Sequence, residues 1–306
     1  AVDTESLAVD TESLAVDTES LAVEDDVKTI NIGDDIKDYK KYTLDEINNL
    51  TLKELQLIAR KNKLKVKEVE KVKVFHGNRE VNMAEFFTVT DNKNDLLEVE
   101  GDMFKIKYIG ANMSSGEILI NGNIGPHLGS AMTGGFIKVN GDAGDWIAPE
   151  MSGGRIHITG NGGHCIASAY RGASTGVSGG EIIIEGNVKN ELGHGMSNAT
   201  IIVGGMCGDF TGVNLNSGTI LTFGEMGIRT GAGMKRGTII CMDNLEILPT
   251  FSYDCLYSPI YLKLFFRYIR DKTKIKFDEK FIDGKFHRWS GDAIEMNRGE
   301  LLVFSA

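Results

Sequence analysis

The chain has 306 residues, with 43 acidic and 33 basic side chains and a formal net charge of −10. Residues 1–26 carry nine acids and no base, so this segment holds nearly all of the excess negative charge. The remaining body is almost neutral, which excludes a protein that binds nucleic acid through a basic face. Apolar runs are too short for a membrane span, which needs about 18 residues, and no signal peptide is evident. We therefore expect a cytoplasmic protein.

The N-terminal part divides into an acidic tail and a cap. Residues 1–42 form an acidic low-complexity segment that opens with three copies of AVDTESL, and we expect it to be disordered. Residues 43–109 are expected to cap the body that follows. Capping boxes predict helices within residues 43–62, and residues 71–91 predict two strands around a turn at Gly77-Asn78. Residues 94–109 are similar to a degenerate extra repeat.

A repeat occupies residues 110–248 and decides the fold. Seven copies follow one another at steps of 19 residues, except for one step of 26. Each copy has an apolar position, a small or turn-forming pair, a β-branched tetrad and usually a glycine. The apolar column consists of Met113, Met132, Met151, Val177, Met196, Leu215 and Met234.

This repeat predicts a solenoid built from strands. Nineteen extended residues span roughly 60 Å, enough to close one coil with three short faces. Stacked coils pair equivalent strands in parallel, and crossovers between parallel strands are right-handed. We therefore predict an all-β solenoid, a right-handed parallel β-helix of about seven 19-residue coils. The apolar column should point inward as core, since a thioether metal site needs methionines that converge on one point.

Residues 249–306 are expected to cap the other end of the solenoid. The segment 259–270 begins with a proline, is densely apolar and predicts a short helix packed over the last coil or against a partner. Residues 281–304 predict strands with turns at Asp283-Gly284 and Gly291-Asp292. The two ends of the chain would thus form small α/β caps that cover the open edges of the sheet.

The single long step marks a seven-residue insertion within residues 168–180. Such an insertion usually projects from the stack and touches something. Tyr170 and Arg171 belong to residue types that are enriched at protein interfaces, so we name them as candidate partner-contact residues. Folding of this loop onto its own coil, or contact with a small molecule, are the alternatives.

No pattern in the sequence carries catalysis or cofactor binding by itself. The histidines His127, His164 and His194 occupy different positions in their coils, which argues against a metal triad. The four cysteines form no CxxC pair and indicate reduced thiols. No nucleophile motif occurs, and no helix follows the glycine corners as phosphate binding would require. We therefore predict no catalytic, cofactor-binding or metal residues in this chain.

Several of these features together resemble a known family. The coil corners Gly122–Gly125 and Gly141–Gly144, the methionine column, and Tyr170-Arg171-Gly172 ahead of Ser178-Gly179-Gly180 are similar to the C subunit of formylmethanofuran dehydrogenase. The segments 74–78 and 86–87 also fit this GXGXG family, which is related to the C-terminal β-helix of glutamate synthase. The closing motifs at 248–251, 259–264 and 291–301 are similar to the branch found in bacterial formyltransferase/hydrolase complexes. Residues 1–42 match neither branch.

The resemblance implies a non-catalytic scaffold subunit. Its partners would be the amidohydrolase-type A subunit, the oxidoreductase-derived B subunit and the formyltransferase D subunit. Zinc or molybdopterin would belong to those partners, and methanofuran would be the formyl carrier. The first alternative is the C subunit of an archaeal-type dehydrogenase that reduces CO2 to formylmethanofuran. A glutamate-synthase-like β-helix protein and an extracellular solenoid are further alternatives, the latter disfavoured because no signal peptide is evident.

Overall fold

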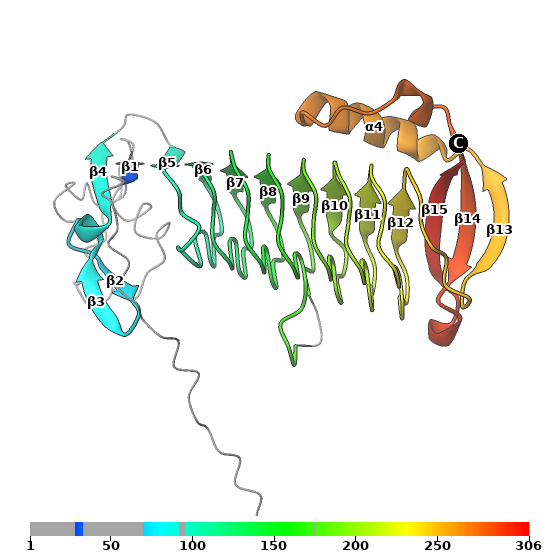
Figure 1. The fold of residues 1–306 in the computed structure, drawn as a ribbon, viewed down its shortest axis with the longest axis horizontal. Coiled ribbons are helices and arrows are strands. Elements are labelled where there is room, and N and C mark those ends of the chain that lie inside the picture. The colour runs from blue at the N-terminus through cyan, green and yellow to red at the C-terminus, as the bar shows by residue number, and fades with distance from the viewer. Residues whose placement is uncertain (1–27, 33–69, 92–95, 174–175, 306) are drawn as a thin grey trace, which may run out of the picture.

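The computed structural model describes residues 28–32, 70–91, 96–173 and 176–305. Its main feature is a parallel β-solenoid of about eight turns, drawn as a row of stacked arrows in Figure 1. One strand per turn enters a single sheet, which strands of the two ends of the chain extend, in the spatial order β13-β14-β15-β12-β11-β10-β9-β8-β7-β6-β5-β1-β4. The solenoid strands are β5 (Leu96–Glu100), β6 (Glu117–Asn121), β7 (Phe136–Val139), β8 (Arg155–Ile158), β9 (Glu181–Ile184), β10 (Thr200–Val203), β11 (Thr219–Thr222) and β12 (Thr238–Cys241).

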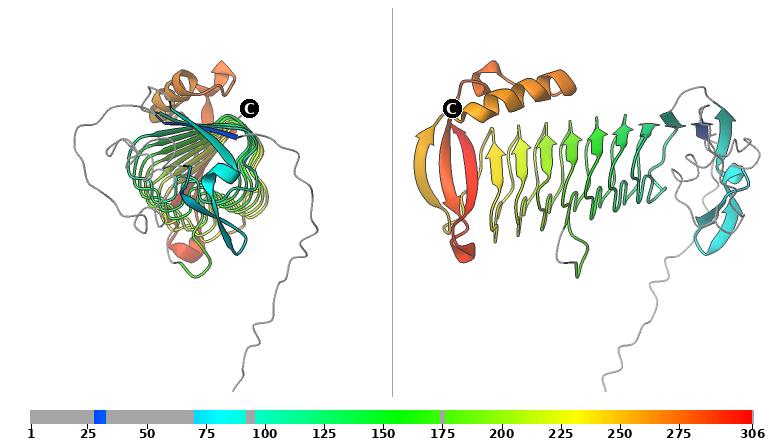
Figure 2. Two further views of the ribbon diagram at one scale, coloured as in Figure 1. Left: turned by 90° about the vertical axis from the view of Figure 1, so that its left-hand side faces the viewer. Right: turned by 180° about the vertical axis from the view of Figure 1, so that it is seen from behind.

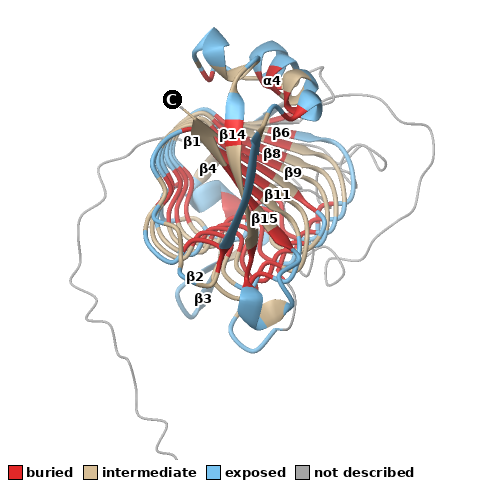
Figure 3. Cartoon of the chain, turned by 90° about the vertical axis from the view of Figure 1, so that its right-hand side faces the viewer, coloured by how far each residue is buried: buried red, intermediate tan, exposed pale blue. Residues whose placement is uncertain are grey.

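The repeat of the sequence sets the register of the sheet. Each tetrad pairs in parallel with the equivalent tetrad of the next coil, so that Ile201 lies beside both Ile182 and Ile220. All seven residues of the apolar column are buried, as predicted. Figure 3 shows buried segments lining the inside of the stacked coils. The strand β5 pairs in parallel with β6 at an offset of 21 residues, as Leu96 does with Glu117, so the degenerate repeat predicted at 94–109 does supply an additional coil.

Glycine is required where neighbouring coils approach each other closely. A Cβ atom on Gly135, whose φ is +88°, would lie 2.5 Å from the methyl group of Met113 in the preceding coil. The same contact recurs one coil later between Gly154 and Met132. The methionine column and the glycine that follows it are therefore one packing device, in which each thioether fills the space that the next glycine leaves open.

The three-faced coil of the sequence prediction is only partly realised. The tetrads form the one continuous sheet of the solenoid, and a second line consists of isolated bridges such as Ile124 with Ala143. On the remaining side each coil carries residues with positive φ at alternate positions, as at Tyr108, Gly110 and Asn112. Left-handed residues cannot continue an extended strand, so this side is a stack of turns.

Both ends of the solenoid change from parallel to antiparallel pairing. At the N-terminal end, β1 (Lys28–Ile32) pairs antiparallel with β5 and parallel with β4 (Phe87–Asp91). The hairpin of β2 (Lys73–His76) and β3 (Arg79–Asn82), predicted around Gly77-Asn78, lies beside it and leads into η1 (Met83–Glu85). The predicted tail and the predicted helices at 43–62 lie outside the described residues, apart from β1.

At the C-terminal end, β15 (Gly299–Ser305) pairs in parallel with β12, and then in antiparallel with β14 (Lys285–Gly291), which pairs with β13 (Ser252–Tyr257). Short η2 (Glu279–Phe281) and η3 (Ala293–Glu295) turns flank β14. The predicted helix exists as α4 (Ile260–Lys272), but it does not cover the end of the stack. Figure 1 shows that it lies along the outer face of the sheet, above β9 to β12.

The outer face explains the position of α4. At the third position of the tetrad, the last four coils carry apolar side chains that pack with the apolar side of the helix. This second core contains Ile183, Ile202, Leu221 and Ile240 from the sheet and Leu262, Phe266 and Ile269 from α4. No helix among the described residues is both long and apolar enough to cross a membrane.

Candidate partner-binding surface

The insertion leaves the solenoid after Ala169 and returns at Val177, which resumes the apolar column. Its base is tied to the next coil, because the amide of Ala169 donates to the carbonyl of His194 at 3.0 Å and that of Gly176 to Gly195 at 3.0 Å. Figures 1 and 2 show the loop projecting from the side of the solenoid opposite to α4. A projecting loop on a fixed base is the arrangement that the insertion predicts.

The two candidate residues of the loop have different surroundings. Tyr170 folds back onto its own solenoid: its hydroxyl lies 2.8 Å from Nδ1 of His127 and 3.3 Å from Oγ of Ser130. Its ring stacks on Trp146 with 5.1 Å between centroids, and burial raises the pKa of its hydroxyl. Arg171, by contrast, is exposed at the start of the loop. Tyr170 therefore packs against its own solenoid, whereas Arg171 is exposed, and the role of both in partner contact stays a prediction.

Tyr170 completes a row of rings that the sequence prediction missed. Tyr108, His127 and Trp146 occupy the same position in three successive coils, each with positive φ. Tyr108 and His127 stack with 4.6 Å between centroids, and His127 and Trp146 with 6.5 Å. The 19-residue spacing of these residues was the available signal. We call Tyr108, His127, Trp146 and Tyr170 the ring ladder.

Each coil supports the strained backbone of the ladder. A non-glycine residue with positive φ is destabilised relative to ordinary backbone conformations and persists where its surroundings hold it. The amide of His127 donates to the carbonyl of Asp145 at 3.1 Å, and that of Trp146 to His164 at 2.8 Å. Burial, with a smaller contribution from Lys107, lowers the pKa of the His127 imidazole. The ladder is thus a neutral, half-buried aromatic strip at the base of the loop.

Three of the four cysteines have thiols whose pKa is raised. Burial, with the carboxylate of Glu191, raises the pKa of Cys165 to about 11. Burial likewise raises the pKa of Cys207 to about 12 and that of Cys241 to about 11. A thiol with such a pKa is protonated at neutral pH, whereas catalysis and metal binding need the thiolate. In the part of the chain that the structure describes, no three His, Cys, Asp or Glu side chains are placed to share a metal ion.

The histidines singled out from the sequence take part in separate contacts. The amide of His164 donates to Asp145, and the ring of His194 lies 3.9 Å from Glu191. His127 belongs to the ring ladder. Their side chains do not form one cluster, in keeping with their different positions in the coils.

A concave surface lies beside α4. A groove of about 330 Å³ runs between the helix and the ends of β10 and β11, and Leu264 on its rim is 68% exposed. Ile260 at the start of the helix is 79% exposed. The residues that line the groove are Thr200, Thr219, Tyr261, Leu264, Phe265 and Tyr268. These residues carry no charged group of the kind that would fix a small polar ligand.

Comparison with known proteins identifies the family. A family model described as the GXGXG motif matches residues 83–253, more than half of the chain. The chain belongs to this family. The resemblance stated from the sequence is therefore confirmed, and the matched residues cover β4 to β12 and the start of β13.

C subunits of formylmethanofuran dehydrogenases are similar to this chain over short segments. The C subunit of the molybdenum-containing formylmethanofuran dehydrogenase 1 of Methanothermobacter marburgensis is 43% identical over 67 residues, which are 21% of this chain and 17% of the relative. The C subunit of the tungsten-containing formylmethanofuran dehydrogenase 2 of Methanothermobacter thermautotrophicus is 37% identical over 68 residues, or 21% of this chain and 25% of the relative. The matched segments thus span a quarter or less of these relatives.

A solved structure matches over nearly the whole length. It is a chain in the crystal structure of the formyltransferase/hydrolase complex (FhcABCD) from Methylorubrum extorquens with methylofuran. The TM-score is 0.75 at 26% sequence identity, and the match covers 91% of this chain and 100% of that chain. The likeness therefore extends beyond the repeat to both ends of the solenoid.

Proposed function

We propose that this chain is the C subunit, a non-catalytic scaffold, of a formyltransferase/hydrolase complex in one-carbon metabolism linked to methanofuran and tetrahydromethanopterin. The observation that carries the proposal is the match to a chain of such a complex over 100% of that chain and 91% of this one. The relatives that are similar in sequence are C subunits of formylmethanofuran dehydrogenases, which points to the same class of assembly.

The properties of the described residues support a scaffold. Backbone hydrogen bonds between successive coils hold the stack, and several side chains of reactive types are buried or paired within it. Cys207 and Cys241 are buried in the stack, and the ring of His157 binds Glu185 at 2.8 Å. A stack of this kind presents an extended surface in fixed geometry, which is what a protein that positions others needs.

The partners follow from the proposed assembly. They would be the amidohydrolase-type A subunit, the oxidoreductase-derived B subunit and the formyltransferase D subunit, with any zinc or molybdopterin held there. The formyl carrier would be a methanofuran-type cofactor. We prefer the hydrolytic over the reductive complex, because the solved structure that matches over 100% of its own chain is a chain of a formyltransferase/hydrolase complex.

The experiment is purification of the tagged chain from its own cells, followed by mass spectrometry of the bound proteins. We expect three further subunits at fixed stoichiometry, formyl transfer and formate release by the complex, and no turnover by the chain alone. A partner set that contains a molybdopterin or tungstopterin protein and reduces CO2 would favour the dehydrogenase alternative. Turnover by the isolated chain, or its recovery without any partner, would contradict the proposal.

A further inference from the structure

The corner of the solenoid that follows the apolar column becomes positively charged in the last coil. The two positions after the apolar column are small or neutral in the first six repeats and are Lys235 and Arg236 in the seventh. The first six pairs are Ser114-Ser115, Thr133-Gly134, Ser152-Gly153, Ser178-Gly179, Ser197-Asn198 and Asn216-Ser217. The backbone hydrogen bond at the first of these positions recurs with neutral residues, since the amide of Asn216 donates to Met196 as that of Lys235 donates to Leu215, so the fold does not require the cations of the last pair.

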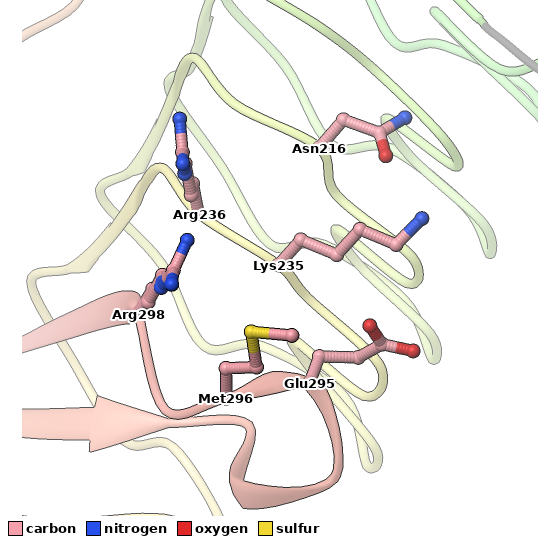
Figure 4. Close-up of a pocket in the computed structure, with 6 residues that line it drawn as sticks. All are labelled: Asn216, Lys235, Arg236, Glu295, Met296 and Arg298. Atoms are coloured by element: carbon pink, nitrogen blue, oxygen red, sulfur yellow. The ribbon is translucent and has the colours of Figure 1, made fainter.

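The sheet register adds a third cation at the same place. Thr238 of β12 pairs with Glu300 of β15, and the amide of Glu300 donates to Gly237 at 3.0 Å. Arg298 therefore occupies the position equivalent to Arg236 in the next strand of the stack. Adjacent strands are about 4.8 Å apart. Figure 4 shows the two guanidinium groups pointing the same way.

These charges are only partly balanced within the part of the chain that the structure describes, because the residues gathered around them include one carboxylate, Glu295, against three cations. No described carboxylate forms an ion pair with Lys235, Arg236 or Arg298. Two guanidinium groups in adjacent layers repel each other, and a carboxylate between them would remove that repulsion and accept paired hydrogen bonds. The corner is thus suited to an oxyanion.

The surroundings indicate which kind of oxyanion fits. The three cations line a cavity of about 310 Å³ together with Asn216, Glu295 and Met296. The η3 turn beside it exposes two apolar side chains, Ile294 at 75% and Met296 at 74%. An inorganic ion would use only the exposed cations, where solvent and salt screen it. A peptide segment that carries both acidic and apolar side chains would use the whole surface.

The corner is connected to the insertion along the solenoid axis. Ser178, Ser197, Asn216 and Lys235 are equivalent residues of successive coils, so the path from the end of the loop to the cations is three coil steps, about 14 Å. The loop and the η3 turn both project from the side opposite to α4 (Figures 1 and 2). Arg171, at the start of the loop, is a further exposed cation.

We propose that this path is a docking site for an acidic segment of a partner protein in the complex. The segment lies extended along the axis between the loop and η3, with a carboxylate held by Arg236 and Arg298 and apolar side chains against Ile294 and Met296. Charge complementarity selects this occupant. The inference rests on the proposed function, because it supplies the site at which such a scaffold holds one of its partners.

Zero-length cross-linking of the purified complex identifies the occupant directly. A carbodiimide joins an amine to a carboxylate in contact with it, and we expect Lys235 to be joined to an Asp or Glu of a partner protein. The Lys235→Arg variant keeps the charge and should lose this product. A cross-link from Lys235 to residues 1–26, the acidic segment of this chain itself, would overturn the assignment to a partner.

Charge reversal tests the energetic role of the corner. We expect Arg236→Glu with Arg298→Glu to weaken retention of that partner by roughly tenfold or more, and to make the remaining binding less sensitive to salt. The matched control, Lys272→Glu with Lys276→Glu, makes the same charge change on exposed residues at the end of α4 and just beyond it, and should retain the partner. Circular dichroism and the melting temperature check that both variants fold.

The outcomes separate this inference from the proposed function. If the wild type holds its partners and the reversed variant holds them equally well at every salt concentration, the docking site is wrong and the proposed function stands. If the wild type holds no partner, the proposed function fails and the docking site fails with it. Equal weakening by the control variant would show a general charge effect and would also overturn the site.

Discussion

The early and late coils of the solenoid share one inner face but differ on the outside. At the third position of the tetrad, Leu119 and Lys138 of the early coils are only partly covered, whereas Ile202 and Leu221 of the late coils are fully buried under α4. The early coils carry the ring ladder instead. The repeat thus determines the interior of the solenoid. On the outside, the early coils carry the ring ladder and the late coils are covered by α4.

The boundary between the halves is polar. At the third position of the β8 tetrad, His157 is 8% exposed and lies 2.8 Å from Glu185, which also accepts from the amide of Lys274 at 2.9 Å. The hydroxyl of Tyr268 donates to Glu181 at 2.7 Å. These contacts hold the C-terminal end of the helix over β8 and β9, and beyond them the outer face is open.

The largest expected effect is on the helix itself. Phe266 is fully buried between α4 and the sheet, so Phe266→Ala should lower the free energy of unfolding by about 3–5 kcal/mol. Arg267→Ala, its exposed neighbour, should change it by less than about 0.5 kcal/mol. Urea denaturation measures both. Similar values for the two variants would mean that α4 contributes little to the stability of the late coils.

A matched pair of leucines compares the two halves directly. Leu221→Ala should cost about 2–5 kcal/mol, because the cavity it leaves lies under α4. Leu119→Ala makes the same change at the equivalent position of an early coil, where the side chain is only partly buried, and should cost less than about 1 kcal/mol. An equal cost at both positions would remove the distinction between covered and open coils.

The polar boundary should contribute less than the apolar contacts. Tyr268→Phe removes a hydroxyl that donates to Glu181 and accepts from Arg155, each at 2.7 Å, and should cost about 1 kcal/mol. Tyr261→Phe removes a hydroxyl of the same helix without a side-chain hydrogen bond to a described residue, and should be neutral within about 0.5 kcal/mol. A larger loss of stability from the Tyr261 variant than from the Tyr268 variant would mean that polar contacts hold α4 mainly at its N-terminal end.

The smallest effect is the pH dependence of the ring ladder. The pKa of His127 is lowered in the folded chain, so the unfolded chain takes up a proton first as the pH falls through the ordinary value of 6.5. Stability from this residue is therefore complete above that pH and declines below it. His127→Gln should make the melting temperature less dependent on pH between about 7 and 5. An unchanged pH profile would show that His127 does not titrate differently in the two states.

The sequence predicts the interior of the fold, but it predicts little of the exterior. The 19-residue step sets the register and the inward methionine column, because both follow from stacking identical units. The sequence also indicates where α4 lies, because the third tetrad position, which is Leu119 and Lys138 in the early coils, is apolar in each of the last four coils. The prediction of a helix over the last coil did not use this pattern. Helix placement depends on which outer face is apolar, and periodicity along one column does not reveal that.

The candidate surface shows the same limit. The insertion was visible as one long step, and Tyr170 and Arg171 were chosen by residue type alone. The structure separates them, because Tyr170 binds His127 while Arg171 is exposed. Likewise, Arg236 and Arg298 are 62 positions apart, and only the parallel pairing of β12 with β15 brings them to one place. Such neighbours are set by the way the chain leaves the repeat, which the repeat cannot predict. The role of both candidates in partner contact stays a prediction.

Hydrogen exchange of the isolated chain and of the assembled complex, followed by mass spectrometry, tests the scaffold account most directly. We predict that assembly slows exchange around residues 170–173 and 293–298, on the side opposite to α4, and leaves the solenoid strands as slow as they are in the free chain. Unchanged exchange in both segments, or strands that become protected only in the complex, would contradict a preformed scaffold that holds its partners on this side.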